Sequence, residues 1–107
     1  MKIAITSNGN TFESQLSKVF ARCEYFLIYD TDNRSHEFVE NPYRTQNEHV
    51  GEDVARFLGE KGIKRIIASE FGSKAKKVTD EFNIQLVVVP DEAKTIASLL
   101  EMMKSHG

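Results

Sequence analysis

Apolar residues recur along the chain in short continuous runs and in helical repeats, and these patterns predict the order of the elements. Three runs have a continuous apolar centre, as expected of strands covered on both faces. These runs span residues 2–6, 63–68 and 84–89. Segment 25–29 is rich in aromatic and β-favouring residues, and segment 35–40 alternates around Phe38 after the polar turn 30–34. The last two segments predict a β-hairpin.

Helical spacing of apolar residues predicts three helices, all in the second half of the chain. Their apolar positions are, in order, Val50, Val54, Phe57 and Leu58, then Phe71, Ala75, Val78 and Phe82, then Ala93, Ile96, Ala97, Leu100 and Met103. Gly62 and Asn83 can end the first two helices, and Asp91 after Pro90 is the expected N-cap of the third. Segment 7–24 lacks clean periodicity and predicts a loop with at most one helical turn.

The predicted order of elements is β-β-β-α-β-α-β-α. Helical crossovers between strands are right-handed and make the connected strands parallel. We therefore expect an α/β protein with a five-stranded mixed sheet in the order 3-2-1-4-5, the second strand antiparallel, and helices on the faces of the sheet. The length of 107 residues suits one domain spanning 1–107.

This topology places a candidate site at the carboxyl edge of the sheet. Loops 7–24, 41–49, 69–73 and 90–92 meet there, around the point where the strand order reverses, which is the usual ligand crevice of open α/β sheets. All three helices are expected to begin at this edge, so their unpaired N–H groups favour an anionic ligand. Arg22 and Arg44 in the converging loops are either further anion contacts or solvated surface residues.

Cys23 and His49 are the candidate metal ligands. Cys23 immediately precedes the second strand, and a thiolate is a soft ligand for iron, copper or molybdenum–sulfur centres. The alternative is a small buried residue under the loop. His49 lies at the start of the first helix, where a neutral imidazole could bind metal. His36 on the outer hairpin strand and His106 in the tail are expected at the surface.

Two glycine-containing loops complete the candidate set. In Ser69-Glu70-Phe71-Gly72-Ser73, Gly72 would let the backbone approach a ligand beside the helix start, or the segment is a tight turn with Ser73 as helix cap. Ser7-Asn8-Gly9-Asn10 suits either a ligand-contacting loop, with Ser7, Asn8 and Gly9 as contacts, or an ordinary turn. Neither loop matches a phosphate-binding glycine motif.

Composition and charge narrow the class of function. Lys and Arg number 14 against 16 Asp and Glu, a net charge of −2, which disfavours generic nucleic-acid binding. A single cysteine excludes an internal disulfide and fits a reducing, cytoplasmic location. No apolar run approaches the length needed to span a bilayer, so we expect no membrane association through such a segment.

Several segments together resemble the dinitrogenase iron-molybdenum cofactor biosynthesis family, which includes the NifX-type and NafY-type nitrogenase cofactor carriers. The resemblance covers nearly the whole chain. It is carried by residues 1–5, 16–30, 40–42, Gly51 with the following helix, and 66–75 with Gly72.

The resemblance implies a ribonuclease-H-like three-layer α/β/α fold and a binding role more than catalysis. Characterised members bind or carry iron-molybdenum cofactor or its precursors, and one related protein holds a molybdenum–copper sulfide cluster. The family's usual His-Phe-Gly stands here as Val19-Phe20-Ala21, so the histidine proposed as a cofactor ligand in some members is absent. Metal ligation in this chain would depend on Cys23 or His49, and binding without ligation on non-covalent contacts.

Three hypotheses follow. The leading one is a small cytoplasmic binding or carrier protein, not an enzyme, with possible protein partners in cofactor assembly. Its ligand would be an anionic metal–sulfur cofactor or precursor, such as an iron-molybdenum or other molybdenum–sulfur cluster, or another small anion. The second is a regulatory or protein-interaction module without a metal ligand. The third, a ribonuclease-H-like nuclease, is disfavoured because such chemistry needs clustered carboxylates, whereas the first strand is Ile3, Ala4 and Ile5 at its centre.

Overall fold

The computed structural model describes residues 1–90 and 94–106, and the sheet has the topology predicted from the sequence. The elements are β1 Lys2–Ser7, β2 Tyr25–Asp30, β3 His36–Glu40, α1 Val50–Glu60, β4 Ile63–Ala68, α2 Ser73–Glu81, β5 Gln85–Val88 and α3 Ile96–His106. The strand order is β3-β2-β1-β4-β5. β2 is antiparallel to both of its neighbours, whereas the β1–β4 and β4–β5 pairs are parallel. The predicted order 3-2-1-4-5 is confirmed.

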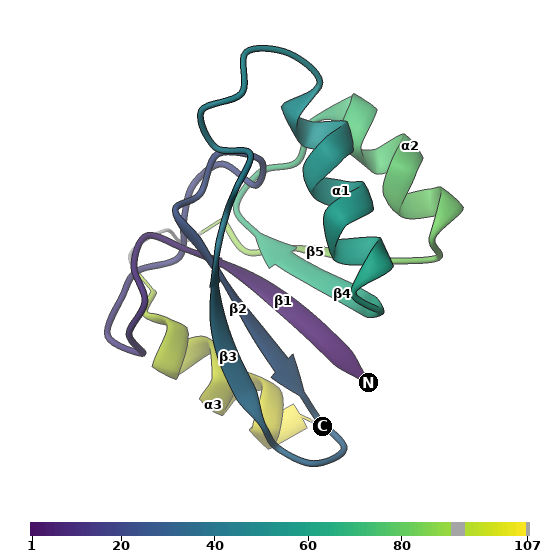
Figure 1. Ribbon diagram of the computed structural model, residues 1–107. Coiled ribbons are helices and arrows are strands. Elements are labelled where there is room, and N and C mark those ends of the chain that lie inside the picture. The colour runs from purple at the N-terminus through teal and green to yellow at the C-terminus, as the bar shows by residue number, and fades with distance from the viewer. Residues whose placement is uncertain (91–93, 107) are drawn as a thin grey trace.

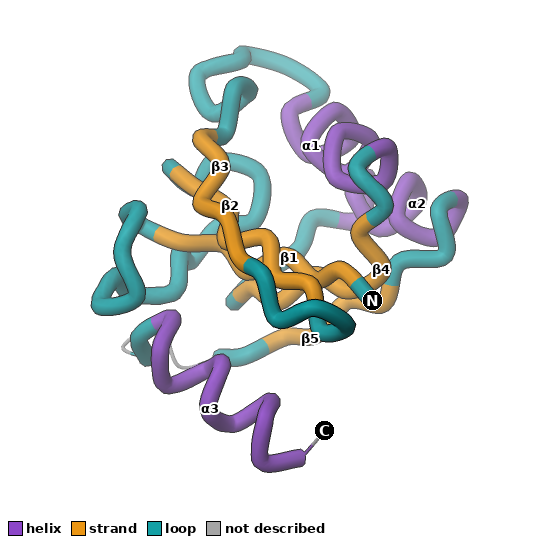
Figure 2. Tube along the Cα trace, turned by 60° about the horizontal axis from the view of Figure 1, so that its bottom comes forward, coloured by secondary structure: helices purple, strands orange, loops and turns teal. Residues whose placement is uncertain are grey.

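The helices lie on both faces of the sheet and make a three-layer α/β/α arrangement, as Figures 1 and 2 show. α1 and α2 cover one face, and α3 covers the other. Alternate residues of β1 divide between the two cores: Ala4 packs with α1 and α2, whereas Ile3 and Ile5 pack with α3. Because both faces are covered, the strand carries a continuous apolar run instead of an alternating one. The expected ribonuclease-H-like layering is confirmed.

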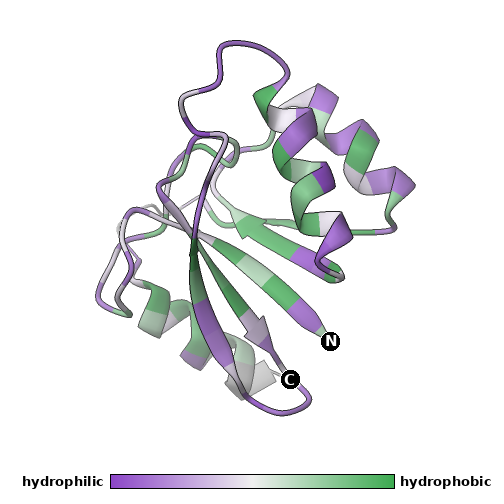
Figure 3. Ribbon diagram, viewed as in Figure 1, coloured by the Kyte–Doolittle hydropathy of each residue, from purple (hydrophilic) through white to green (hydrophobic). Residues whose placement is uncertain are grey.

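Hydropathy follows this layering. Figure 3 shows apolar residues concentrated on the central strands and the sheet-facing sides of the helices, and polar residues along the outer connections. The long connection from β3 to α1 is among the most polar segments. None of the described helices combines the length and apolar character needed to cross a membrane.

The start of α3 differs from the prediction. Asp91 and Ala93 lie outside the described residues, and the described helix begins at Ile96. Its cap is Thr95, whose Oγ1 accepts a hydrogen bond from the Ser98 N–H at 3.2 Å. Segment 7–24 is an irregular loop, as predicted, and it forms isolated β-bridges, including one between Gln15 and Thr95. Contacts between distant segments therefore decide where α3 begins.

The contact between α1 and α2 depends on Gly59. A Cβ atom at Gly59 would lie only 2.5, 2.6 and 2.8 Å from Cγ, Cδ1 and Cδ2 of Phe82. We expect Gly59→Ala to lower the free energy of unfolding by about 1–3 kcal/mol through overpacking. This cost exceeds the gain of about 1 kcal/mol that alanine has over glycine in a helix.

Urea denaturation of the variant and the wild type measures this change. Phe82→Ala provides the matched background, because it removes the Cγ, Cδ1 and Cδ2 atoms that the new methyl group would meet. In that background Gly59→Ala should be neutral or stabilising. An equal loss of stability in both backgrounds would show that the Phe82 ring is not the cause.

Candidate functional site

A pocket of about 510 Å³ lies at the carboxyl edge of the sheet, between α1 and α2. Three segments line it: residues 19–22 before β2, residues 49–52 at the start of α1, and residues 70–75 at the start of α2. Figure 1 shows the beginnings of α1 and α2 side by side above the end of β4. Volumes of 300–1,000 Å³ are typical of small-molecule sites. The pocket is therefore large enough for a multi-atom ligand.

The first turns of two helices supply most of the polar backbone of the pocket. Within the described part of the chain, neither α1, whose N-cap is His49, nor α2, whose N-cap is Gly72, has a side-chain capping hydrogen bond. The first intrahelical bonds are donated by Asp53 and Lys76, each one turn into its helix. The N–H groups of the residues before them, which line the pocket, are the ones a helix leaves unpaired. They favour a negatively charged ligand.

The expectation that all three helices present free N–H groups to the crevice is wrong for α3. Its first N–H groups are taken up by the loop after β1: Ile96 donates to the Ser14 carbonyl and Ala97 to the Phe12 carbonyl, both at 2.9 Å. The side chain of Thr95 caps a third N–H group. α3 also packs on the opposite face of the sheet. Among the helix starts that the structure describes, those of α1 and α2 therefore belong to the pocket and that of α3 does not.

Small side chains leave the space that forms the pocket. A Cβ atom at Gly51 would lie 3.4 Å from the Cβ of Ala75 and 4.0 Å from that of Ala21, so the three segments approach closely at these positions. Around them the walls are apolar. Phe20 and Phe71 pack with ring centroids 5.3 Å apart, and the exposed Val19 stands at the rim.

The charged side chains of the pocket balance each other. Arg22 and Lys74 carry positive charge, and Glu52 and Glu70 carry negative charge. His49 lies with Nδ1 at 3.3 Å from Oε1 of Glu52, and its side chain is 65% exposed. Side chains alone therefore give the site no net attraction for anions, and the two helix N-termini provide it.

Arg22 has a more specific role than a surface arginine. Its Nη1 donates to the carbonyl oxygens of Arg44 and Gln46 at 3.0 and 2.9 Å, which ties the pocket wall to the loop before α1. Arg44 instead points to Glu24, with an ion pair at 3.8 Å, and is not among the lining residues. Of the two arginines considered from the sequence, only Arg22 reaches the pocket.

The expectation that Cys23 lies in the crevice is wrong. Its side chain is 1% exposed and belongs to the core beneath the loop, with Phe20 and Phe26. Burial raises the pKa of the Cys23 thiol from 9.0 to about 12, an effect that hydrogen bonds from Ser7 and Asn41 only partly oppose. The burial supports the alternative interpretation of Cys23 as a small buried residue under the loop, because a protonated thiol away from the pocket is a poor metal ligand.

The buried thiol predicts a distinct dependence of stability on pH. Between about pH 9 and 12 the unfolded chain releases the thiol proton whereas the folded protein keeps it. The folded state then binds more protons, so the free energy of unfolding falls by about 1.4 kcal/mol per pH unit in that window and is unaffected below it. Urea denaturation of wild type and Cys23→Ala at pH 8 to 11 isolates this contribution, because the other groups titrate in both. A thiol reagent that reacted rapidly with folded protein at pH 8 would contradict the assignment.

Ser7, Asn8 and Gly9 do not line the pocket, which corrects their expected role as ligand contacts. The Ser7 hydroxyl donates to the Gly9 carbonyl at 2.6 Å and accepts from the Gly9 N–H at 3.2 Å. The Asn8 N–H donates to the Gln15 carbonyl. These groups stabilise their own turn, as the alternative interpretation held. His36 is exposed and packs edge-on against Phe12, and the side chain of His106 lies outside the described residues.

Gly72 and Ser73 do line the pocket, with roles that differ from those expected. Gly72, not Ser73, occupies the cap position, at φ −80° and ψ 154°, an extended conformation open to any residue. A Cβ at Gly72 would meet nothing within 4 Å. The glycine therefore leaves open space beside the helix start and is not needed for backbone geometry.

The pocket is also lined by Glu52, Glu70 and Lys74, which the sequence analysis did not predict as site residues. In the sequence, nothing distinguishes these charged residues from ordinary solvated ones. The signal that could have found them was the predicted helix starts, because first-turn residues lie beside the N–H groups of the helix. Among residues 1–90 and 94–106, no three His, Cys, Asp or Glu side chains gather to hold a metal ion.

Comparisons with known proteins agree with this architecture. The pattern of the dinitrogenase iron-molybdenum cofactor family matches residues 1–106. An uncharacterized protein of Methanocaldococcus jannaschii is 33% identical over 89 residues, which cover 80% of this chain and 72% of that protein. A putative NifB protein from Thermotoga has 31% identity and a TM-score of 0.82, with 97% of this chain and 87% of that chain covered.

A structure at lower identity shows the same fold. The apo form of the orange protein from Desulfovibrio gigas superposes with a TM-score of 0.89 at 21% identity and covers 98% of this chain and 88% of its own. The resemblance inferred from the sequence is confirmed. The chain belongs to the dinitrogenase iron-molybdenum cofactor family.

Proposed function

We propose that the protein binds and carries an anionic molybdenum–sulfur cofactor or precursor in the pocket between α1 and α2, and that residues 1–107 act as one cytoplasmic, non-catalytic domain. The observation that carries the proposal is the pair of uncapped helix starts lining one cavity. Membership of the family supports an association with iron-molybdenum cofactor.

We propose that the ligand is held by hydrogen bonds to its own sulfide or oxide atoms, without a protein–metal bond. Cys23 is buried and protonated, Val19 has no donor atom, and Nδ1 of the pocket-lining His49 lies 3.3 Å from Oε1 of Glu52. Backbone N–H groups bind anions readily. The apolar walls around Phe71 and Val19 disfavour strongly hydrated ions, because such ions lose more solvation on entering the pocket. A sulfide-rich anion should therefore bind more tightly than an oxyanion of equal charge.

Anaerobic mixing with tetrathiomolybdate and copper, or with iron-molybdenum cofactor, followed by gel filtration and metal analysis, tests the proposal. Molybdenum should elute with the protein, and molybdate offered in the same way should bind more weakly. Elution of the protein without metal under all conditions would reject this ligand class.

Two variants separate hydrogen bonding from metal ligation. Cys23→Ala and His49→Asn, each checked for folding by circular dichroism, should retain bound molybdenum. Loss of molybdenum from a folded Cys23→Ala or His49→Asn variant would instead show that the thiol or the imidazole binds the metal.

A second candidate function is a regulatory or protein-interaction module of the same fold without a small ligand. The burial of Cys23 favours it, because the chain then offers no thiolate at the pocket. Thermal-shift screening distinguishes the two. Stabilisation by sulfide-containing anions supports the carrier, and no stabilisation by any small molecule supports the module.

A further inference from the structure

Arg22 is placed to act on the pocket through the loop that leads into α1. Its Nη1 makes both hydrogen bonds to the Arg44 and Gln46 carbonyls, which belong to the connection between β3 and α1. Arg22 itself stands on segment 19–22, one wall of the pocket. The guanidinium thus connects the pocket wall at 19–22 to the loop that leads into the wall at the start of α1.

Gln46 continues this connection into the helix. Its Nε2 donates to the Glu48 carbonyl and to Oδ2 of Asp53, both at 2.6 Å. Asp53 lies in the first turn of α1, and its N–H donates to the His49 carbonyl at 3.0 Å. Gln46 is not among the residues that line the pocket. Its side chain therefore acts on a ligand indirectly, through its hydrogen bonds to the loop before α1 and to the first turn of that helix.

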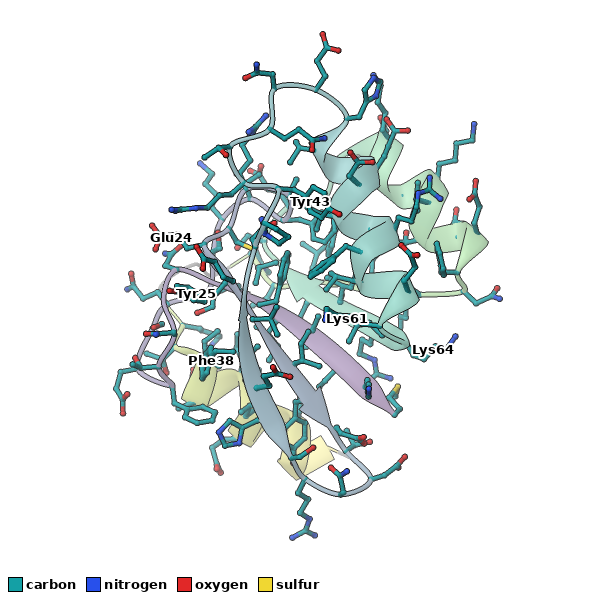
Figure 4. The ribbon with its side chains drawn as sticks, in the orientation of Figure 1. Glu24, Tyr25, Phe38, Tyr43, Lys61 and Lys64 are labelled. Atoms are coloured by element: carbon teal, nitrogen blue, oxygen red, sulfur yellow. The ribbon has the colours of Figure 1, made fainter. Side chains whose placement is uncertain are left out.

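The backbone of His49 is what these contacts hold in place. His49 has φ 58° and ψ 22°, the left-handed conformation that residues other than glycine adopt at a cost. Such a conformation persists where the surroundings enforce it. Packing adds to the hydrogen bonds, because Tyr43, labelled in Figure 4, extends from the same loop and meets the ring of Phe57 edge-on at 5.7 Å. Together these contacts set the direction of the first-turn N–H groups of α1.

We propose that Arg22 and Gln46 are positioning residues that aim the first turn of α1 at the ligand, and that Arg22 acts through this loop and not as a direct ionic anchor. The binding readout of this inference rests on the proposed function. Both residues work through the same loop, so the effects of removing them should not multiply. A direct anchor at Arg22 would be independent of Gln46.

The test is a double-mutant cycle of Arg22→Ala and Gln46→Ala, with the dissociation constant of tetrathiomolybdate measured anaerobically. Each single variant should weaken binding about tenfold, the value of roughly one well-made hydrogen bond. The double variant should be close to the weaker single variant. Asn47→Ala, an exposed neighbour on the same loop, should leave binding unchanged. Unchanged affinity in Gln46→Ala, or multiplied losses in the double variant, would overturn the inference.

Hydrogen exchange without ligand gives an independent result. Both single variants should speed exchange at the first hydrogen-bonded amides of α1, Asp53 and Val54, about tenfold. Gln46→Glu should do the same, because it loses the amide donor. Adding Asp53→Asn to that variant supplies a donor from the helix side and should restore slow exchange in part, because the hydrogen bond to the Glu48 carbonyl stays lost.

The two arms keep the inference separate from the proposed function. If the wild type fails to bind tetrathiomolybdate, that ligand class is rejected and the exchange data alone decide the inference. Exchange rates that match the wild type in Arg22→Ala and Gln46→Ala would overturn the positioning role of these two residues, whether or not the protein binds a ligand.

Discussion

Replacing Gly72 with aspartate is expected to stabilise the folded protein and at the same time to weaken its affinity for anions. Gly72 already has the extended backbone of a helix N-cap, and α2 has no acidic residue in its first turn and no side-chain cap. A carboxylate there can accept from the free N–H groups and interact favourably with the helix dipole. The free energy of unfolding should rise by about 0.5–1 kcal/mol.

The same carboxylate should weaken anion binding by about 30-fold or more. It takes up the N–H groups that the ligand needs, and it repels a unit negative charge by roughly 2 kcal/mol at about 8 Å and an effective dielectric constant of about 20. No clash opposes the substitution, because an added Cβ at Gly72 meets nothing within 4 Å. Titration with tetrathiomolybdate and urea denaturation measure the two effects on the same sample.

Gly72→Asn is the matched control. Asparagine caps a helix about as well as aspartate but carries no charge, so it should stabilise the protein and weaken binding much less. If Asp and Asn weaken binding equally, the loss comes from occupation of the N–H groups and the added negative charge does not contribute. If neither variant affects binding, the ligand site lies elsewhere on the molecule.

The largest loss of stability is expected from Asn41→Ala, about 3 kcal/mol. The Asn41 side chain is 1% exposed, and its Nδ2 donates to the Ala21 and Cys23 carbonyls, each at 2.9 Å. Its Oδ1 accepts from the Tyr43 N–H at 3.0 Å. Truncation leaves three backbone groups without these partners, and unsatisfied buried groups cost about 1–3 kcal/mol each before relaxation and water entry reduce the sum.

Urea denaturation of Asn41→Ala and of Asn47→Ala provides the comparison. Asn47 is an exposed asparagine on the same loop, so its truncation should change stability by less than about 0.5 kcal/mol. Similar small effects at both positions would show that the loop does not depend on the buried amide. Because Asn41 joins segment 21–23 to the connection before α1, its loss should also disturb the pocket wall that carries Arg22.

Val19 replaces the histidine that the family resemblance implies at this position. Val19 stands at the rim with 43% exposure and offers no donor atom. The uncapped starts of α1 and α2 do not depend on that side chain. A ligand held by backbone N–H groups would therefore survive the replacement, whereas one that needs an imidazole at this position would not.

The sequence by itself determined the fold. Each element follows from a local pattern of apolar and polar residues. These patterns are the continuous apolar runs of the inner strands, the hairpin pattern at residues 25–40 and the helical repeats. Because helical crossovers are right-handed, these elements then indicate the sheet order 3-2-1-4-5. Because the sheet edge follows from that order, the starts of α1 and α2 and the residues His49, Gly72 and Ser73 were placed correctly beside a common pocket.

Only the tertiary structure decided which candidates reach the ligand space. Cys23 and Arg22 are adjacent in sequence, yet one side chain enters the core and the other reaches the pocket and the loop before α1. The first N–H groups of α3 are occupied by carbonyls of Phe12 and Ser14, more than eighty residues earlier in the chain. Periodicity reports only on residues that are neighbours along the chain. Helix capping, side-chain burial and the hydrogen bonds of Arg22 depend on segments that meet only after folding.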